Sequence, residues 1–330
     1  METVFISQDE VAGLLPMSDC IDAVRQALGD LGRGEGIQPL RRVMWLHDKV
    51  GALGMMPGYL ASIETVGIKT VTVFPGNAGT EYDSHQGTVM LFDASNGRLK
   101  AVIDATDITA IRTAAASAVA TDALARPDSS VLAVLGAGVQ GHSHVEAIPL
   151  VRDIDEIRVW SRSSESAARL CETAGPERAR AVETPAETVA GADIVCTTSA
   201  SAEPILYGSL LEPGMHVNAV GSSVPFAREL DSDAMGRARI FVDRRESTLN
   251  ESGDFLMAQA DGVVDAGDIV AEIGEIIAGT HRGRESETEI TVFVSLGLAV
   301  EDLAAADLVY RNALQNDRGV KIEFGGARHD

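Results

Sequence analysis

The sequence is poor in cysteine and contains no long apolar run. Its three cysteines, Cys20, Cys171 and Cys196, are too few and too widely spaced for a disulfide framework or a four-thiolate metal site, and they favour a reducing compartment. No window approaches the about 18 uninterrupted apolar residues of a membrane-spanning helix. The N-terminus METVFISQDEV has no basic segment followed by an apolar one, so no secretory signal is expected. We therefore expect a cytoplasmic protein without a metal site.

Positive charge is also scarce. The 27 Lys and Arg residues stand against 49 Asp and Glu residues, which gives a net charge of -22. This sign repels phosphate backbones and anionic lipid, so we expect neither a nucleic acid nor a membrane as partner. Hydrophobic residues at 45% and charged residues at 23% are typical of a globular chain, and 330 residues are enough for about two domains.

The first third of the chain predicts helices followed by a sheet. Residues 7–32 have apolar positions at helical spacing and are interrupted by Pro16, which predicts two consecutive helices. Residues 38–100 contain short alternating segments of high β-propensity, and Asn96-Gly97 predicts a hairpin. The final segment 319–330, GVKIEFGGARHD, is expected to return to this sheet and to make the first domain discontinuous.

After an Ala- and Thr-rich helical stretch from Thr106 to Ala125, the pattern changes to apolar strands that alternate with helices. This alternation predicts a doubly wound parallel sheet, so the fold class is α/β with a Rossmann domain beside an α+β N-terminal domain. We expect residues 1–118 and 308–330 to form the α+β domain and residues 119–307 the Rossmann domain. The stretch 289–317 is expected to be helical.

A glycine-rich turn provides the most specific local signal. The apolar strand VLAVL at 131–135 runs into Gly136, Gly138 and Gly141, spaced G-x-G-x-x-G, and a helix follows. In this context the glycines allow a tight turn, close approach of a pyrophosphate and packing of the helix on the sheet, while the helix N-terminus attracts the diphosphate. An ordinary strand-turn-helix with small residues is the alternative.

The end of the next strand indicates which dinucleotide binds. An Asp or Glu there would accept hydrogen bonds from the ribose hydroxyl of NAD. This sequence instead has Arg162, flanked by Ser161 and Ser163, and a guanidinium with neighbouring hydroxyls suits a 2′-phosphate. NADP(H) is therefore favoured and NAD(H) is possible, because Arg162 could instead stack on the adenine and allow both cofactors.

Two other patterns are weaker. His142 and His144 lie two residues apart, whereas a zinc pair on one helix face needs a spacing of four, so capping and solvent exposure are favoured. Gly221-Ser222-Ser223 does not complete the nucleophile elbow G-x-S-x-G, because Pro225 occupies the last glycine position.

Motifs spread over nearly the whole chain resemble those of one enzyme family. They include QPLRRV at 38–43, GMMPGY at 54–59, RTAAASAVAT at 112–121, HVNAVGSSVPFAREL at 216–230, ESGD at 251–254 and SLGLAVEDLAAA at 295–306. In these stretches the chain resembles the ornithine cyclodeaminase/mu-crystallin family, and most closely its ketimine reductase branch. The resemblance implies a homodimer in which the N-terminal domain binds substrate and mediates dimerisation.

The resemblance also implies which residues act. Arg41, Lys69 and Arg112 would bind the carboxylate of a small imino or amino acid, and either Lys69 or His85 would supply the proton. Lys69 could instead be an exposed strand residue or pair with a structural Asp, and His85 could be a structural histidine. The remaining substrate-binding candidates are Met56 and Ser223. The cofactor-binding candidates are Thr113, Gly136, Ala137, Gly138, Val139, Gln140, Ser161, Arg162, Ser163, Thr197, Thr198, Ser199, Val220, Gly221 and Ser222.

Departures from the family pattern narrow the chemistry. Ser223 and Gly54 stand where the cyclodeaminase branch has acidic residues, and neither can exchange a proton near neutral pH. Val224 and Val294 stand where the reductase branch often has cations. An extra negative charge on the substrate would therefore lack these two partners. Arg228 is a cation that remains in this region, but in the sequence Arg228-Glu229-Leu230 it could equally form a surface ion pair.

The sequence therefore predicts an NAD(P)H-dependent reductase of cyclic or open imino acids, such as ketimines, Δ1-pyrroline-2-carboxylate or Δ1-piperideine-2-carboxylate. The alternatives are an alanine dehydrogenase, an ornithine cyclodeaminase-type ammonia lyase, and a non-catalytic protein that binds cofactor and ligand.

Overall fold

The computed structural model describes residues 2–77 and 79–325, which form two compact units. Unit 1 consists of Met1–Arg112 with Leu298–Asp330, and unit 2 of Thr113–Gly297. The boundaries expected after residues 118 and 307 fall inside helices α3 (Thr106–Leu124) and α11 (Ala299–Gln315). The boundary between Arg112 and Thr113 also lies inside α3, so this helix contributes residues to both units.

Unit 1 is built on a mostly antiparallel sheet in the order β16-β1-β7-β6-β5-β4-β2, with β3 also paired to β4. Within it only β1 and β7 pair in parallel among the described residues. The expected return of the chain end is confirmed, since β16 pairs antiparallel with β1, and Asn96-Gly97 lies in the turn joining β6 to β7. The strands are β1 (Glu2–Ile6), β2 (Gly36–Ile37), β3 (Arg42–Trp45), β4 (Ala52–Leu60), β5 (Thr65–Val73), β6 (His85–Asp93), β7 (Leu99–Asp104) and β16 (Val320–Glu323).

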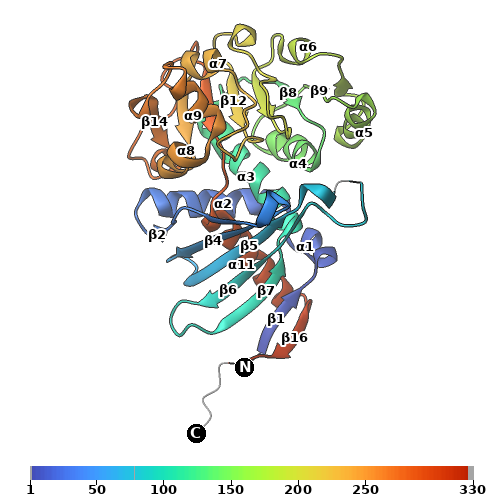
Figure 1. The fold of residues 1–330 in the computed structure, drawn as a ribbon, viewed down its shortest axis with the longest axis vertical. Coiled ribbons are helices and arrows are strands. Elements are labelled where there is room, and N and C mark those ends of the chain that lie inside the picture. The colour runs from blue at the N-terminus through green and yellow to red at the C-terminus, as the bar shows by residue number, and fades with distance from the viewer. Residues whose placement is uncertain (1, 78, 326–330) are drawn as a thin grey trace. The chain divides into compact units, whose positions relative to one another are not determined.

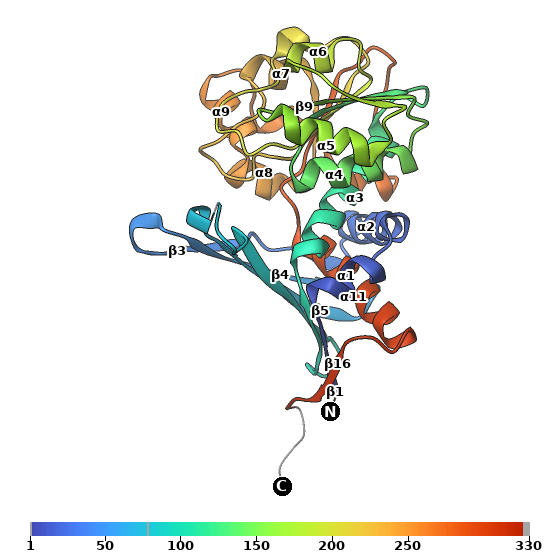
Figure 2. The same ribbon diagram turned by 90° about the vertical axis from the view of Figure 1, so that its right-hand side faces the viewer.

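Helices α1 (Gln8–Leu14) and α2 (Met17–Gly32) confirm the two expected N-terminal helices, with Pro16 as the N-cap of the second. Together with α11 they cover one face of the sheet of unit 1 (Figure 2). Gly67 of β5 allows α11 to come close, because a Cβ at this position would lie 2.5 Å from the Leu303 side chain. This close approach sets the acidic residues at the start of α11 against β5.

Unit 2 contains a fully parallel sheet in the order β10-β9-β8-β11-β12-β15-β13-β14. The chain moves outward in one direction through β9 and in the other through β11, so β8 stands at the topological switch point. The doubly wound sheet is thereby confirmed (Figure 1). Its strands are β8 (Val131–Leu135), β9 (Glu156–Trp160), β10 (Ala179–Ala181), β11 (Ile194–Thr197), β12 (His216–Ala219), β13 (Arg239–Val242), β14 (Ile269–Glu272) and β15 (Thr291–Val294).

Helices pack on both faces of this sheet. On one face the alternating apolar residues of the central strands form a core with α6 (Pro185–Val189), α7 (Ser232–Arg237) and α9 (Gly253–Ala260). On the other face Asn218 of β12 donates a hydrogen bond of 2.9 Å to Thr121 of α3. The other helices of this unit are α4 (Val139–Ala147), α5 (Ser164–Ala174), α8 (Arg245–Glu251) and α10 (Ile273–Ile277).

The expectation of one helical stretch over 289–317 is wrong. Thr291–Val294 form the fully buried strand β15 between β12 and β13, and helix α11 begins only at Ala299. A short apolar run is compatible with a buried strand or a buried helix, and here the β-branched and aromatic residues TVFV decide for the strand. Among the described residues no helix is long and apolar enough to cross a membrane.

Candidate functional site

The turn between β8 and α4 places each of its three glycines under a different steric demand. Gly136 has φ of 127°, and a Cβ there would lie 2.7 Å from the backbone of Thr198. At Gly141 a Cβ would overlap the carbonyl of Gly136, so this glycine permits the first helical turn to pack close. Gly138 is the N-cap of α4 and faces open space, with no atom within 4 Å of a Cβ position. A turn of this shape directs free backbone N–H groups at an anion.

The predicted cofactor residues after β11 and β12 lie at the same edge of the sheet as this turn. In the parallel register Thr197 is opposite both Leu135 and Ala219, so all three strands end together. Thr198 donates a hydrogen bond of 3.1 Å to the carbonyl of Gly136. The structure thus brings the glycine turn, residues 197–199 and residues 220–222 to one edge of unit 2, while Thr113 is buried at the start of this unit's part of α3.

Ser161, Arg162 and Ser163 follow β9, the strand next to β8. Arg162 is exposed and makes no ion pair with any other described residue. Ser163 is the N-cap of α5, and its hydroxyl accepts a hydrogen bond of 3.2 Å from the backbone of Ser166. The guanidinium is therefore available to an anion, whereas the Ser163 hydroxyl is already engaged in capping.

In unit 1 a buried lysine and a buried arginine share one carboxylate. Lys69 of β5 and Arg112 of α3 are 3% and 4% exposed. The Lys69 ammonium lies 3.0 Å from Asp302 Oδ1, and Arg112 Nε donates to the same oxygen at 2.8 Å. Arg112 Nη1 also donates to Glu301 at 2.9 Å. The first turn of α11 therefore supplies two acids that hold the two cations side by side.

Burial changes the ionisation of this cluster. The pKa of Lys69 falls to about 8, mainly because burial disfavours its charge, and Asp302 only partly opposes this effect. For Arg112 burial acts in the same direction, but Asp302 and Glu301 outweigh it and the pKa rises above its usual value. Arg112 remains charged at all relevant pH values, whereas Lys69 can lose its proton under mildly alkaline conditions.

The pairing of Lys69 with an Asp, one of the alternatives from the sequence, is what the structure contains. It leaves the lysine two further N–H donors and leaves Arg112 Nη2 without a partner among the described residues. The carboxylate thus orients both cations without using all their donors. Asp302 Oδ2 is buried and has no hydrogen-bond partner in the described part of the chain.

Three further candidates of unit 1 belong to the neighbourhood of Lys69. Met56 of β4 is buried and directly opposite Lys69 in the strand register. Arg41 is half-buried, and its charge contributes to the lowered pKa of Lys69. His85 begins β6 and lies 3.1 Å from the Ser84 hydroxyl; its pKa is lowered because nearby protein disfavours charge and because Lys69 adds a like charge. Ser223 is half-buried in unit 2.

The expected exposure of His144 is wrong. Its ring nitrogens lie 2.7 Å from the Gln140 carbonyl and 2.9 Å from the Ser117 hydroxyl, and burial lowers its pKa to about 4. The contact with Ser117 of α3 joins residues 27 positions apart, so the spacing of the two histidines did not reveal it. No group of three or more His, Cys, Asp or Glu residues in 2–77 and 79–325 is arranged to hold a metal ion.

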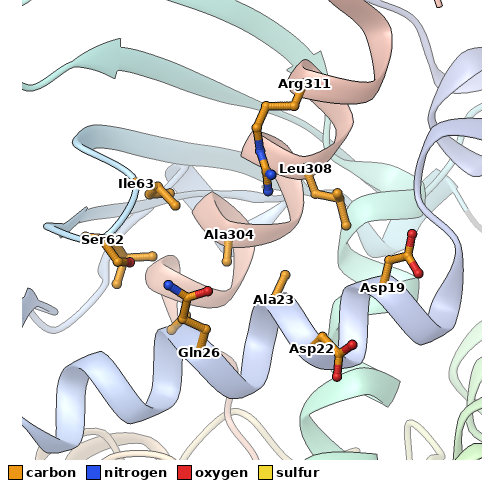
Figure 3. Close-up of a pocket in the computed structure, with 11 residues that line it drawn as sticks. Asp19, Asp22, Ala23, Gln26, Ser62, Ile63, Ala304, Leu308 and Arg311 are labelled. Carbon is orange, nitrogen blue, oxygen red and sulfur yellow. The ribbon is translucent and has the colours of Figure 1, made fainter. Parts of the chain in front are cut away.

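A cavity of about 290 Å³ lies in unit 1 between α2, α11 and the turn after β4 (Figure 3). Asp19, Asp22 and Gln26 line it from α2, and Arg311 lines it from α11. None of the residues predicted to bind substrate or cofactor lies in its wall. It is separate from the candidate site.

Four buried acids escaped the sequence analysis as functional residues. Glu301 and Asp302 were visible only as two charges within the apolar run GLAVEDLAAA, and this interruption was the available signal. Glu229 and Asp254 belong to motifs quoted for the resemblance but received no role. Glu229 is fully buried. Arg228 forms the kind of surface ion pair that the sequence allowed, with Asp261 at 3.4 Å.

A parallel sheet with a glycine turn at its switch point defines unit 2 as a Rossmann dinucleotide-binding fold. The whole chain belongs to the ornithine cyclodeaminase/mu-crystallin family, whose sequence profile matches residues 1–317.

Known relatives cover nearly the whole chain. The ketimine reductase mu-crystallin of Mus musculus is 44% identical over 93% of this chain and 96% of its own length. The structure of Thermococcus litoralis Δ1-pyrroline-2-carboxylate reductase, in complex with NADH and L-proline, is 35% identical with a TM-score of 0.94, covering 97% and 100% of the two chains. An archaeal alanine dehydrogenase dimer with bound NAD is also 35% identical, with a TM-score of 0.93 and coverage of 98% and 100%.

Proposed function

We propose that this protein is an NAD(P)H-dependent reductase that transfers hydride to the C=N bond of small cyclic or open imino acids. The observation that carries the proposal is the buried Lys69–Asp302–Arg112 cluster, in which one carboxylate orients two cations that keep unused donors. Two cations fixed in this way suit a substrate carboxylate, and charge-assisted hydrogen bonds are strongest where water is excluded. The ketimine and pyrroline-carboxylate reductases to which the chain is similar act on substrates of this class.

When bound, the reduced nicotinamide supplies the hydride. Arg112, Lys69 and Arg41 bind the substrate carboxylate and so fix the position of the imine carbon, which supplies the proximity contribution to catalysis. The imine nitrogen must be protonated to make that carbon electrophilic. Lys69, with a pKa of about 8, can hold a proton at neutral pH and release it, and His85 is the second donor candidate.

Residues that are absent define the reaction further. Ser223 and Gly54 provide no ionisable group where a cyclodeaminase needs one, which disfavours ammonia elimination from ornithine. Val224 and Val294 provide no cation for a second substrate carboxylate. We therefore propose a monocarboxylate substrate with an uncharged side chain, such as Δ1-pyrroline-2-carboxylate or Δ1-piperideine-2-carboxylate.

An initial-rate panel tests this function. NADPH and NADH are each combined with the two cyclic imino acids and with pyruvate plus ammonia or methylamine. The oxidised cofactors are each combined with ornithine alone. We expect loss of NADPH absorbance only when an imine is present or can form. Turnover with pyruvate and ammonia that exceeds turnover with the cyclic imines would favour an alanine dehydrogenase, to which the chain is also similar. Ammonia release from ornithine without net NADH formation would contradict the proposal.

The exposed Arg162 supports a preference for NADPH. We expect Arg162→Ala to raise the KM for NADPH by about tenfold or more, since about 1.5–3 kcal/mol of charge-assisted hydrogen bonding to the 2′-phosphate is lost. The KM for NADH should change by less than about twofold, because NADH has no phosphate at this position. Steady-state kinetics with both cofactors measure the two values, and equal losses for NADPH and NADH would indicate stacking on the adenine.

We also propose that the chain forms a homodimer through the sheet of unit 1. β3 is exposed along its whole length, and Val43, Met44 and Trp45 are each about half exposed although they are large apolar residues. Contiguous exposed apolar side chains are typical of an interaction surface. Sedimentation equilibrium is expected to give a dimer, and Trp45→Glu together with Val43→Glu to shift it toward the monomer.

The lowered pKa of Lys69 predicts a pH dependence of substrate binding. Lys69 is protonated below about pH 8 and neutral above it, so binding of a carboxylate should weaken as the pH rises through about 8. Furan-2-carboxylate, a monocarboxylate with no titrating nitrogen, is the probe: we expect competitive inhibition, and its inhibition constant is measured from about pH 6.5 to about pH 9.5. Asp302→Asn should move the transition to lower pH, because Asp302 favours the charged lysine. An inhibition constant that stays unchanged across this range would exclude Lys69 as the titrating group.

A further inference from the structure

Glu229 joins the two loops that follow β11 and β12. Its Oε1 accepts hydrogen bonds from the backbone N–H and the hydroxyl of Ser199, both at 2.6 Å. Its Oε2 accepts a hydrogen bond of 2.7 Å from the backbone N–H of Gly221. The side chain is fully buried, so one carboxyl group spans from one loop to the other inside unit 2.

A second buried acid fixes the backbone of Glu229. Asp254, in the first turn of α9, accepts hydrogen bonds from the backbone N–H groups of Glu229 at 2.8 Å and Leu230 at 2.9 Å. Gly253 allows this approach, because a Cβ there would overlap the carbonyl of Ala227. The motifs 228–230 and 251–254 thus form one hydrogen-bonded arrangement. Asp254 of α9 fixes the backbone of Glu229, and the Glu229 side chain connects the two loops.

The two loops lie so close together that no side chain fits at Gly221. A Cβ at Gly221 would overlap both the carbonyl of Ser199 and the carboxyl of Glu229. The two loops are therefore in direct contact at this point, with the carboxyl wedged beside them. Thr198 of the first loop also bonds to Gly136 of the glycine turn, so a displacement of residues 198–201 would reach that turn as well.

Burying the carboxyl groups of Glu229 and Asp254 costs folding free energy, so a contribution to fold stability does not explain their presence. Neither Glu229 nor Asp254 forms a salt bridge with a cation among the described residues, and burial raises their pKa values to about 7 and about 6. Buried carboxyl groups without a paired cation destabilise a protein relative to apolar packing. Glu229 accepts its hydrogen bonds from Ser199 and Gly221, which are predicted cofactor residues, and Asp254 accepts its hydrogen bonds from the backbone of Glu229 and Leu230.

We propose that Glu229, held by Asp254, is a positioning residue for the dinucleotide: it sets the separation of loops 198–201 and 220–223 so that their backbone groups can bind the cofactor. The proposal rests on the proposed function, because it presumes that unit 2 binds NAD(P)H. Glu229 acts through the loops and does not itself touch the reacting atoms.

The matched control lies at the opposite end of the same strands. Asp193 precedes β11, and its Oδ2 accepts hydrogen bonds from the backbone N–H groups of Ser130 at 2.9 Å and Val131 at 3.0 Å, next to the start of β8. It therefore joins two neighbouring strands through backbone donors just as Glu229 joins two loops, but at the edge away from the glycine turn. Asp193→Asn reports the effect of lost stability alone.

The experiment compares the full-length wild type, Glu229→Gln and Asp193→Asn by NADPH titration, steady-state kinetics and thermal unfolding. The glutamine presents an N–H₂ group to one of the loop donors, so we expect the Kd and KM for NADPH to rise by about tenfold or more while kcat at saturating NADPH stays within about threefold. Asp193→Asn should lower the unfolding temperature without changing the Kd for NADPH by more than about twofold. If Glu229→Gln does not fold, Asp254→Asn is measured in its place, with an expected rise of about threefold to tenfold.

The outcomes separate the two proposals. Wild-type protein that does not bind a dinucleotide would overturn the proposed function itself. Wild-type binding with an unchanged Kd in Glu229→Gln, or in Asp254→Asn where that is the variant measured, would overturn only the positioning role. An equal rise in Kd in Asp193→Asn would assign the effect to general destabilisation and would overturn it as well.

Discussion

Replacing Lys69 by methionine is expected to lower kcat/KM for an imino acid by about 1000-fold, because a desolvated charge pair with the substrate carboxylate is worth about 2–5 kcal/mol. Methionine has nearly the length of lysine and packs in the same buried space beside Met56, so the change removes charge with little change in volume. The variant should also lose about 3 kcal/mol of unfolding free energy, since Asp302 keeps only Arg112 as its partner. Steady-state kinetics and urea unfolding measure the two effects.

The double variant Lys69→Met, Asp302→Asn separates catalysis from stability. Removing both members of the ion pair takes away the uncompensated buried charge, so most of the lost unfolding free energy should return. The activity should not return, because the substrate carboxylate still lacks its lysine. Recovery of kcat/KM together with stability would mean that Lys69 is a structural residue paired with an Asp, which is the alternative that the sequence left open.

Replacing Gly138 by alanine is expected to weaken NADPH binding by about 100-fold or more and to leave the fold intact. The residue has φ of -87°, which any amino acid adopts, and no protein atom lies within 4 Å of the new Cβ. We propose that a pyrophosphate approaches the turn on this side of Gly138. The methyl group would then displace the ligand, at a cost of about two charge-assisted hydrogen bonds of about 1.5–3 kcal/mol each.

Gly13→Ala provides the matched control, because Gly13 also has open space around its Cβ position but lies in α1 of unit 1. Both variants should unfold at or slightly above the wild-type temperature, since alanine restricts the unfolded chain. Only Gly138→Ala should lose NADPH affinity in a fluorescence titration. Normal binding by Gly138→Ala would show that the diphosphate does not lie against this turn.

Several elements were predictable because their signals are local. Pro16 separates α1 from α2, and Asn96-Gly97 turns β6 into β7, because each of these residues restricts or extends the backbone at its own position. The expected return of the segment 319–330 to the first sheet is confirmed for residues 320–323, which pair with β1. Strand β15 was mistaken for helix because a buried run of four residues has no period to distinguish the two.

The sequence by itself determined the Rossmann unit and the glycine turn, since spacing and residue type indicate what a turn after a strand can bind. The cations Arg41, Lys69 and Arg112 followed only from the resemblance to the family. Only the tertiary structure decided what those cations contact. Lys69 and Asp302 are 233 residues apart and Arg112 and Asp302 are 190 apart, so no local pattern relates them. The same holds for Glu229, whose carboxyl meets Ser199 from 30 residues away. Burial makes these contacts necessary, because a polar or charged group removed from water needs a hydrogen-bonding or oppositely charged partner. The fold brings that partner from a distant part of the sequence.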